Sequence, residues 1–233
     1  MANTSAGDPL DGLLGNSITS ESSNSSSNEA PSNVNSGIKT ATSVLDLNQY
    51  MIKEKFWRIF GNKFWFQDVN EKRYGFCEQK RFKLKEDIRI YSDESKNHEW
   101  LKIKQKQMVD AWGGYDIMDS QSGEHIGTVR RKFWASILRT RWYLLDAAGN
   151  EIGMLIEDSM GYALARRVLL GMFLPKKFHI EIGGGTEFVT MRQKFNPFIK
   201  KLVVNIPPNH PLDRRFIAGL AIVIAAVDGR GKK

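Results

Sequence analysis

Paired basic residues that stand beside aromatic residues are the strongest candidates for chemistry in this sequence. Lys and Arg attract anionic lipid headgroups, and Trp and Phe settle at headgroup depth, so the mixture suits a membrane surface. It also suits stacking of nucleic-acid bases, and a solvated sheet exterior is the purely structural alternative. The candidates are Arg130, Arg131 and Lys132; Arg139 and Arg141; Arg166 and Arg167; Lys176 and Lys177; and Lys200 and Lys201.

The net charge of the chain also favours an anionic partner. The formal net charge is +8 over 233 residues. The first 48 residues hold more acids than bases, so the rest of the chain is more basic than the total suggests. Such a field attracts anionic lipid, nucleic acid or acidic proteins, and does not choose among them.

Residues that serve catalysis or metal binding form no recognisable pattern. Cys77 stands in a strand-like run and is interpreted as a packed side chain, because a catalytic thiol needs a His brought beside it. The Gly run at 183–185 is interpreted as a hairpin turn, since no Lys-Ser/Thr pair follows it. The histidines, which show no metal-type spacing, are His98, His125, His179 and His210. The sequence therefore predicts a non-enzymatic protein without a metal or cofactor.

The beginning of the chain differs in composition from the rest. Residues 1–45 are rich in Ser, Asn and Gly and cannot bury enough apolar surface to offset the entropy of ordering. The sequence predicts a disordered tail there and a folded domain over residues 46–233. Without a secretory signal, and with Cys77 as the single cysteine, the expected location is cytoplasmic, peripheral at the cytoplasmic face of a membrane.

The elements that must position the basic clusters begin near residue 50. Aromatic and β-branched residues alternate there with polar ones in short runs. Phe64 and Phe66 share one face of such a run, and Ile88 and Ile90 share one face of another. This period of two is typical of half-buried antiparallel strands.

A loose internal repeat organises these strands. FWFQDVNEKRYGF, YDIMDSQSGEHIGTV and WYLLDAAGNEIGMLI each end an apolar strand at an Asp, and a Gly follows seven or eight residues later. The pairs are Asp68 and Gly75, Asp119 and Gly127, and Asp146 and Gly153. An Asp can bond the backbone that follows it, and a Gly relieves crowding in the returning strand. Consecutive hairpins of this kind predict an up-and-down sheet, which closes at roughly ten or more strands because closure removes its edges.

The last run, RRFIAGLAIVIAAVDGR, has no polar side chain between Phe216 and Val227. Twelve residues of helix cover ~18 Å, whereas a bilayer core is ~30 Å thick. We therefore expect a helix buried inside the barrel, where Gly219 and several alanines keep it slim. Insertion into a membrane and burial in the groove of a partner are the alternatives. A second, short helix is expected over DSMGYALARRVLLGMFLP, which ends at Pro175.

The Asp-turn-Gly hairpins, the IGTVRRK run at 126–132, the lateral helix and the ending DRRFIAGLAIVIAAVDG resemble the LURP-one-related and phospholipid-scramblase family. The resemblance covers about residues 45–230 and rests on the order of the elements. It implies a tubby-like fold, which is a closed antiparallel barrel of about twelve strands around a hydrophobic C-terminal helix. It also implies membrane association, because scramblases move lipid and tubby domains bind phosphoinositide headgroups through basic residues.

The expected function is thus a mainly β, non-enzymatic barrel that engages anionic phospholipid, with scramblase-like activity as the finer expectation. The alternatives are a nucleic-acid-binding or regulatory tubby-like module, and a structural barrel that binds a protein partner. The calcium dependence of scramblases does not carry over. The matching region, VVNIPPNHPLDRR, holds one carboxylate, and calcium takes six to eight oxygen ligands.

Overall fold

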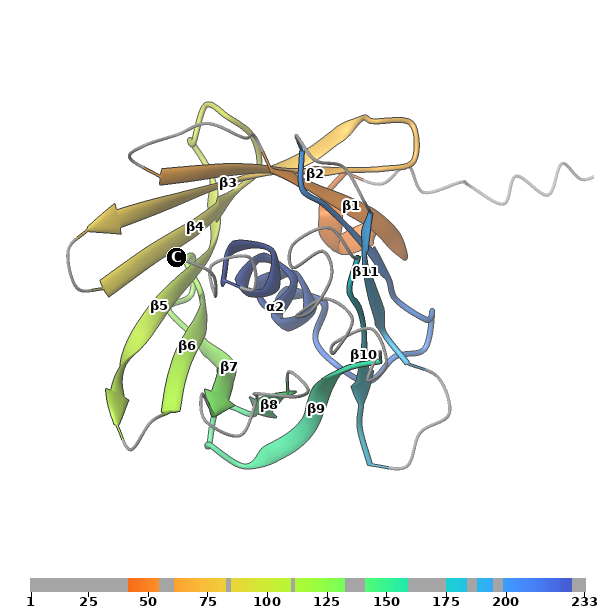
Figure 1. Ribbon diagram of the computed structural model, residues 1–233. Coiled ribbons are helices and arrows are strands. Elements are labelled where there is room, and N and C mark those ends of the chain that lie inside the picture. The colour runs from red at the N-terminus through yellow and green to blue at the C-terminus, as the bar shows by residue number, and fades with distance from the viewer. Residues whose placement is uncertain are drawn as a thin grey trace, which may run out of the picture. The chain divides into compact units, whose positions relative to one another are not determined.

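The computed structural model describes residues 42–54, 61–82, 85–109, 112–132, 141–158, 175–183, 188–194 and 199–227. Within these ranges twelve strands form a closed antiparallel barrel around one long helix, which Figure 1 shows at the centre. The helical elements are the short 3-10 helix η1 (Val44–Asp46) and the helix α2 (Arg214–Val227). The strands are β1 (Gln49–Glu54), β2 (Gly61–Gln67), β3 (Arg73–Phe82), β4 (Lys85–Tyr91), β5 (Glu99–Val109), β6 (Trp112–Asp119), β7 (His125–Lys132), β8 (Arg141–Leu145), β9 (Glu151–Glu157), β10 (Lys177–Glu181), β11 (Thr190–Lys194) and β12 (Lys201–Asn205).

The strands follow one another around the barrel in sequence order, and β1 closes it by pairing with β12. At the closure Tyr50 lies opposite Val204 and Ile52 lies opposite Leu202, and all four side chains are buried. Because every described strand has a partner on both sides, the sheet exposes no free edge within these ranges. The predicted fold class, a closed up-and-down barrel of about twelve strands around a C-terminal helix, is confirmed.

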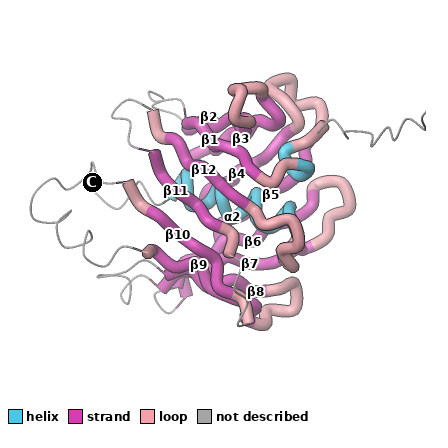
Figure 2. The backbone as a smooth tube through the Cα atoms, turned by 90° about the vertical axis from the view of Figure 1, so that its right-hand side faces the viewer, coloured by secondary structure: helices cyan, strands magenta, loops and turns pink. Residues whose placement is uncertain are grey.

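The up-and-down order gives the barrel two distinct ends. The turns at 68–72, 92–98, 120–124 and 146–150 lie at one end, which we call the turn end and which Figure 2 shows as a row of loops. Helix α2 starts at the turn end, because residues 206–213 connect it to the end of β12. It therefore runs through the barrel toward the opposite end, which we call the far end.

The Asp-turn-Gly repeat forms the described turns in the predicted way. The carboxylate oxygen Oδ1 of Asp68 accepts hydrogen bonds from the backbone N–H groups of Asn70, at 2.8 Å, and Lys72, at 2.9 Å. Asp119 and Asp146 accept from their following turns in the same manner. Each Asp thus satisfies turn donors that would otherwise need water.

Two of the three repeat glycines, Gly127 and Gly153, stand where a neighbouring backbone oxygen leaves no room for a Cβ atom. A Cβ atom on Gly127 would lie 2.5 Å from the carbonyl oxygen of Leu145 and 2.7 Å from the ring atom Cε2 of Phe216. A Cβ atom on Gly153 would collide with the carbonyl oxygen of Glu181. The missing side chain at Gly127 therefore makes room for the first aromatic residue of α2 and for the neighbouring strand.

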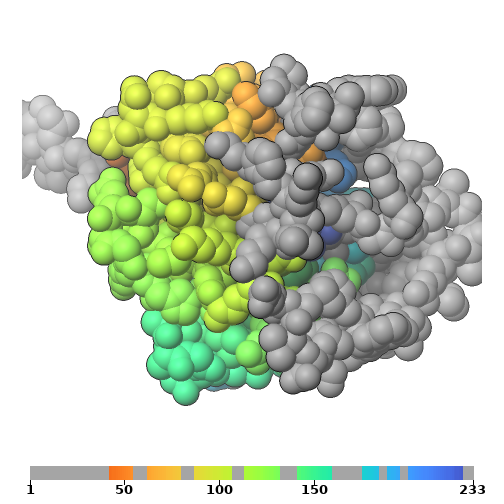
Figure 3. All heavy atoms as spheres, turned by 90° about the vertical axis from the view of Figure 1, so that its left-hand side faces the viewer, coloured from red at the N-terminus to blue at the C-terminus, as the bar shows by residue number. Residues whose placement is uncertain are grey.

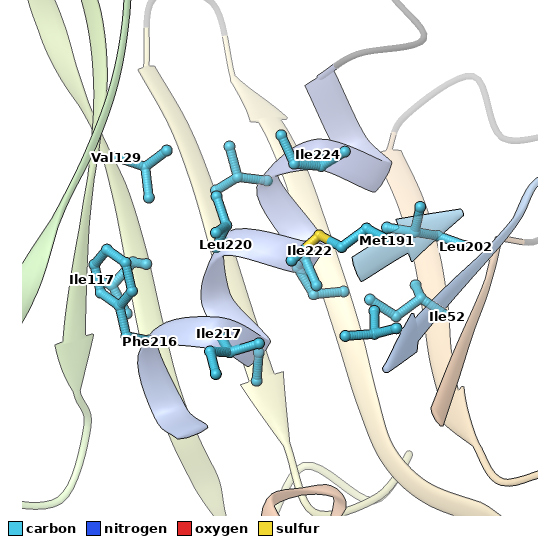
Figure 4. Close-up of a cluster of buried hydrophobic side chains, with 14 of the residues drawn as sticks. Ile52, Ile117, Val129, Met191, Leu202, Phe216, Ile217, Leu220, Ile222 and Ile224 are labelled. Atoms are coloured by element: carbon cyan, nitrogen blue, oxygen red, sulfur yellow. The ribbon is translucent and has the colours of Figure 1, made fainter. Parts of the chain in front are cut away.

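Helix α2 is buried along most of its length. The described side chains from Phe216 to Ile224 are at most 2% exposed. In Figure 4 they lie among core residues of both sides of the barrel: Ile117 and Val129 on one, and Ile52, Met191 and Leu202 on the other. A Cβ atom on Gly219 would lie 2.9 Å from side-chain atoms of Ile117. The close contact between α2 and the barrel wall therefore favours glycine at this position. The prediction of a buried core helix is confirmed.

The length of α2 agrees with this placement. Among the described helices, none is both long and apolar enough to cross a bilayer.

Two sequence-based expectations fall on residues outside the described ranges. The expected tail over 1–45 lies outside them as far as residue 41, whereas Val44 belongs to η1 and is 1% exposed. The helix expected over DSMGYALARRVLLGMFLP lies outside them except at its first and last residues. Both expectations stay predictions.

Candidate functional site

Alternation along the strands splits each described basic cluster between the two faces of the barrel wall. Successive strand residues point to opposite faces. On β7, Arg130 is exposed, whereas Arg131 follows the inward side of buried Val129 and places its guanidinium 5.3 Å from the ring centroid of buried Trp142. Adjacent basic residues in the sequence are therefore not adjacent on the surface.

The pair Lys176 and Lys177 behaves in the same way. Lys177 is exposed, whereas the Nζ atom of Lys176 lies 5.9 Å from the ring centroid of buried Phe178 and 3.8 Å from Oε2 of Glu157. Lys176 therefore belongs to the inner rim of the far end, and Lys177 belongs to the outer wall.

The pair Lys200 and Lys201 is divided as well. Lys200 reaches Glu54, with 3.5 Å between Nζ and Oε2, and Glu54 continues the inward side of Ile52. Lys201 faces outward opposite Lys53. The inner rim of the far end thus carries paired charges, and a separate set of cations lies outside.

The outer cations converge on four neighbouring strands that face the viewer in Figure 2. Lys201 lies directly opposite Lys53 on one side and Lys194 on the other, and Arg192 lies directly opposite Lys177. We call this set the basic strip: Lys53 on β1, Lys201 on β12, Arg192 and Lys194 on β11, and Lys177 on β10.

Direct opposition of like charges costs stability. Side chains at opposed positions of an antiparallel pair have Cβ atoms ~4.5–5.5 Å apart, and like charges there repel. Lys53 and Lys201 are 27% and 24% exposed, so solvent screens their repulsion incompletely. Glu71 offsets part of it, at 3.9 Å from Lys53 and 4.0 Å from Lys201. A negatively charged surface in contact with the strip would offset the repulsion that Glu71 leaves.

The composition of the outer wall reinforces this positive field. The other outward positions of β1, β11 and β12 are neutral: Gln49, Met51, Thr190, Val203 and Asn205. Met51 and Val203 are half-buried and lie between the cations. The strip therefore combines positive charge with some aliphatic surface.

Several aspartates of the barrel lie at the turn end instead. Asp68, Asp93, Asp119 and Asp146 all stand in or beside its turns. A hydrogen bond from the backbone of Ser122, together with bonds from Arg215 and other groups, lowers the pKa of Asp119 to about 2 despite partial burial. Asp119 thus stays ionised at neutral pH. The strip lies toward the far end, where β1 and β11 finish and β12 starts.

The basic residues predicted from the sequence therefore lie in different places. Lys177 and Lys201 belong to the strip, and Arg130 and Arg141 are exposed elsewhere on the outer wall. Arg131, Lys176 and Lys200 lie at the inner rim. Arg139, Arg166 and Arg167 fall outside the described residues, and the side chain of Lys132 is not described.

Sequence reasoning missed Lys53, Arg192 and Lys194. None of the three stands next to another basic residue, so a search for adjacent charges passes over them. The spacing of Arg192 and Lys194 could have revealed them, because two cations separated by one residue on a strand share a face. The contribution of Lys53 comes from the pairing of β1 with β12, which no local pattern shows.

One described cluster has the residue types of a hydrolytic site. The hydroxyl of Thr128 donates to Oδ1 of Asp116 at 2.6 Å and lies 3.3 Å from Nε2 of His125. Thr128 is 4% exposed, and Lys106 also pairs with Asp116, at 2.9 Å. Because the hydroxyl is sealed from substrate and already bonded to a carboxylate, the cluster works as a polar link between β6 and β7.

Among the described residues, neither the cysteine nor the acids and histidines provide a second kind of site. Burial raises the pKa of the Cys77 thiol well above its ordinary value, which disfavours the nucleophilic thiolate. In the part of the chain that the structure describes, no group of three or more His, Cys, Asp and Glu side chains is arranged to hold a metal ion.

Comparison with known proteins agrees with the barrel. A family model described as LURP-one-related matches residues 48–225, a range that runs from just before β1 into α2. No curated protein matches the chain.

Proposed function

This chain belongs to the LURP-one-related family, and we propose that its barrel is a non-enzymatic module that binds anionic membrane surfaces through the basic strip. The observation that carries the proposal is the direct opposition of Lys201 to both Lys53 and Lys194. An arrangement that costs stability in the free protein is explained when a negative surface neutralises it.

The neighbours of the strip favour lipid over nucleic acid. Base stacking needs an aromatic ring with an open face. The ring opposite Lys53 belongs to Trp65, whose face is covered by Arg73 at 5.3 Å and whose indole N–H donates to Glu94 at 2.7 Å. Met51, by contrast, offers a half-buried aliphatic side chain of the kind that settles at headgroup depth.

Surface binding is also preferred over scramblase-like lipid movement. Helix α2 is enclosed by the barrel, and Arg214 and Arg215 hold its first turn to the turn end. Binding through the strip leaves this enclosure intact, so the barrel stays on the surface of the bilayer and does not insert into it.

Vesicle sedimentation with a matched pair of variants tests the proposal. Arg192→Gln with Lys194→Gln removes two outward cations of β11. Lys102→Gln with Lys104→Gln removes two outward cations at the same spacing on β5, six strands away in either direction. Figure 3 shows the wall that β5 shares with β4 and β6, in yellow to green. The two variants have the same net charge, so a difference between them reports position.

We expect the wild type to bind phosphatidylglycerol-containing vesicles and to leave pure phosphatidylcholine vesicles in solution. Each cation near the surface contributes about 1 kcal/mol, so the β11 variant should lose roughly thirty-fold in affinity. The β5 variant should stay within a few-fold of the wild type. Equal binding to neutral vesicles, or equal losses of affinity in both variants, would contradict the proposal that the basic strip binds anionic membranes. Displacement from vesicles by duplex DNA at equal phosphate concentration would favour the nucleic-acid alternative.

A further inference from the structure

His179 lies on the outer wall at the border of the basic strip, between two carboxylates. Its Nδ1 atom contacts the carboxylate of Asp158, and its Nε2 atom lies 2.8 Å from Oε1 of Glu181. The imidazole is 19% exposed, and its ring packs against Phe188 with 5.3 Å between centroids. Both ring nitrogens are therefore directed at an acid.

This geometry distinguishes the two protonation states of the ring. A neutral imidazole carries one N–H group and donates to one carboxylate, so the other carboxylate faces a lone pair. The imidazolium donates to both. Partial burial lowers the pKa of His179, but the hydrogen bonds to Glu181 and Asp158 outweigh it, and the net shift is upward.

Asp158 lies beside Lys177 of the strip as well as beside His179. Its backbone N–H donates to the carbonyl oxygen of Lys177 at 3.0 Å, which places the two residues side by side. The charged groups around the imidazole are Asp158 on the β9 side, Lys177 and Glu181 on β10, Arg192 on β11 next to Thr190, and Arg141 on β8 beyond Ile156. Lys177 and His179 thus stand on the same face as alternative cations for one carboxylate.

We propose that protonation of His179 controls the affinity of the basic strip for anionic membranes by deciding the partner of Asp158. When His179 is charged, Asp158 bonds to the imidazolium and Lys177 is available to lipid headgroups. When His179 is neutral with its proton on Nε2, it donates to Glu181, Asp158 pairs with Lys177, and the strip loses one cation. This inference rests on the proposed membrane binding and adds its regulation.

The test measures sedimentation with vesicles of phosphatidylglycerol and phosphatidylcholine at about pH 5.5 and about pH 8.5, values on either side of the histidine titration range. Ionic strength is kept constant, and the phosphodiester of the lipid stays ionised throughout. The loss of one cation predicts that the wild type binds about five-fold more tightly at the lower pH. His179→Gln and Lys177→Gln should each remove most of this difference. His98→Gln, in the turn at 92–98, should keep it.

The outcomes separate the regulation from the binding itself. Binding with a full pH effect in His179→Gln or in Lys177→Gln overturns the exchange of partners. Binding that does not depend on pH in the wild type overturns the regulation and leaves the proposed function standing. Absence of binding at both pH values overturns both. An NMR titration of the His179 ring in the wild type, with a midpoint at or below ~6.5, would also overturn the regulation.

Discussion

The guanidinium of Arg215 lies 2.9 Å from the carboxylate of Asp119, which ties the first turn of α2 to the end of β6. The same guanidinium reaches Glu124 at 3.0 Å, and Arg214 donates to the carbonyl oxygen of Leu47 at 2.8 Å. The two arginines that precede the apolar run therefore fasten the helix to the turn end of the barrel.

Asp119→Asn should weaken this attachment. We expect a loss on the order of 1 kcal/mol in the free energy of unfolding at neutral pH, because the pair is partly exposed and screened. The folded pKa of Asp119, about 2, lies below its ordinary value of 3.8, so its contribution is present above about pH 4 and disappears as the pH falls to about 2. Urea denaturation across this range should show less acid destabilisation in the variant. An identical pH slope in both proteins would contradict the assignment.

Leu220, which is fully buried on α2, should be intolerant of charge. Leu220→Asp leaves an unpaired charge in the core and should unfold the domain, whose total stability is about 5–15 kcal/mol. Leu220→Ala should cost about 2–5 kcal/mol and keep a cooperative transition. Circular dichroism with urea denaturation measures both. A Leu220→Asp protein that unfolds as cooperatively as the wild type would show that α2 is dispensable for the core.

Gly127→Ala should destabilise the barrel by about 1–3 kcal/mol, because the added methyl meets Leu145 and Phe216. Gly114→Ala is the matched control, since its nearest neighbours lie at 3.7 Å, an ordinary contact distance. There the gain from a less flexible unfolded chain, about 0.4–1 kcal/mol, should dominate. Thermal denaturation should show a lower melting temperature than the wild type for Gly127→Ala and a higher one for Gly114→Ala. Changes of the same sign would contradict the close approach at Gly127.

Neutralising Lys201 should raise stability while it lowers membrane affinity. Removal of its repulsion with Lys53 and Lys194 should gain a few tenths to about 1 kcal/mol at low salt. The gain should fade as salt screens the charges. Lys104→Gln should have the opposite sign, because Lys104 lies opposite Asp87 and Asp116. Urea denaturation at low and high salt checks both, and a destabilised Lys201→Gln would contradict the repulsion.

Removal of residues 1–41 should leave the melting temperature within a few degrees. Removal of residues 1–47 should lower it clearly, because it deletes buried Val44 and the backbone acceptors of Arg214. Burial of one Val contributes about 1.5–3 kcal/mol, which is several degrees for a domain of this size. A large loss in the shorter deletion would assign a stabilising role to the tail.

Much of the barrel follows from local patterns. Phe64 and Phe66 share one face of their strand, and both are buried as predicted. Asp119 and Gly127 mark a turn whose hydrogen bonds and crowding are those expected of the two residue types. These features are readable because a strand has a period of two and a turn bonds to its own backbone.

The location of α2 was likewise determined by the sequence. A run that is apolar on every side needs an enclosure, and twelve residues are too few to span a bilayer. Length and composition together therefore favour burial inside the barrel over a membrane-spanning helix before any coordinate is known. The finding that Phe216 to Ile224 are almost fully buried confirms this reasoning.

The candidate site, in contrast, was decided by the tertiary structure. The sequence determined that the chain is basic and that its cations stand in adjacent pairs, such as Lys200 and Lys201. The period of two sends the members of each described pair to opposite faces, and the closure of β1 on β12 brings Lys53 beside Lys201. Which cations meet depends on the register between strands from the two ends of the domain, and register is fixed only when the whole core packs.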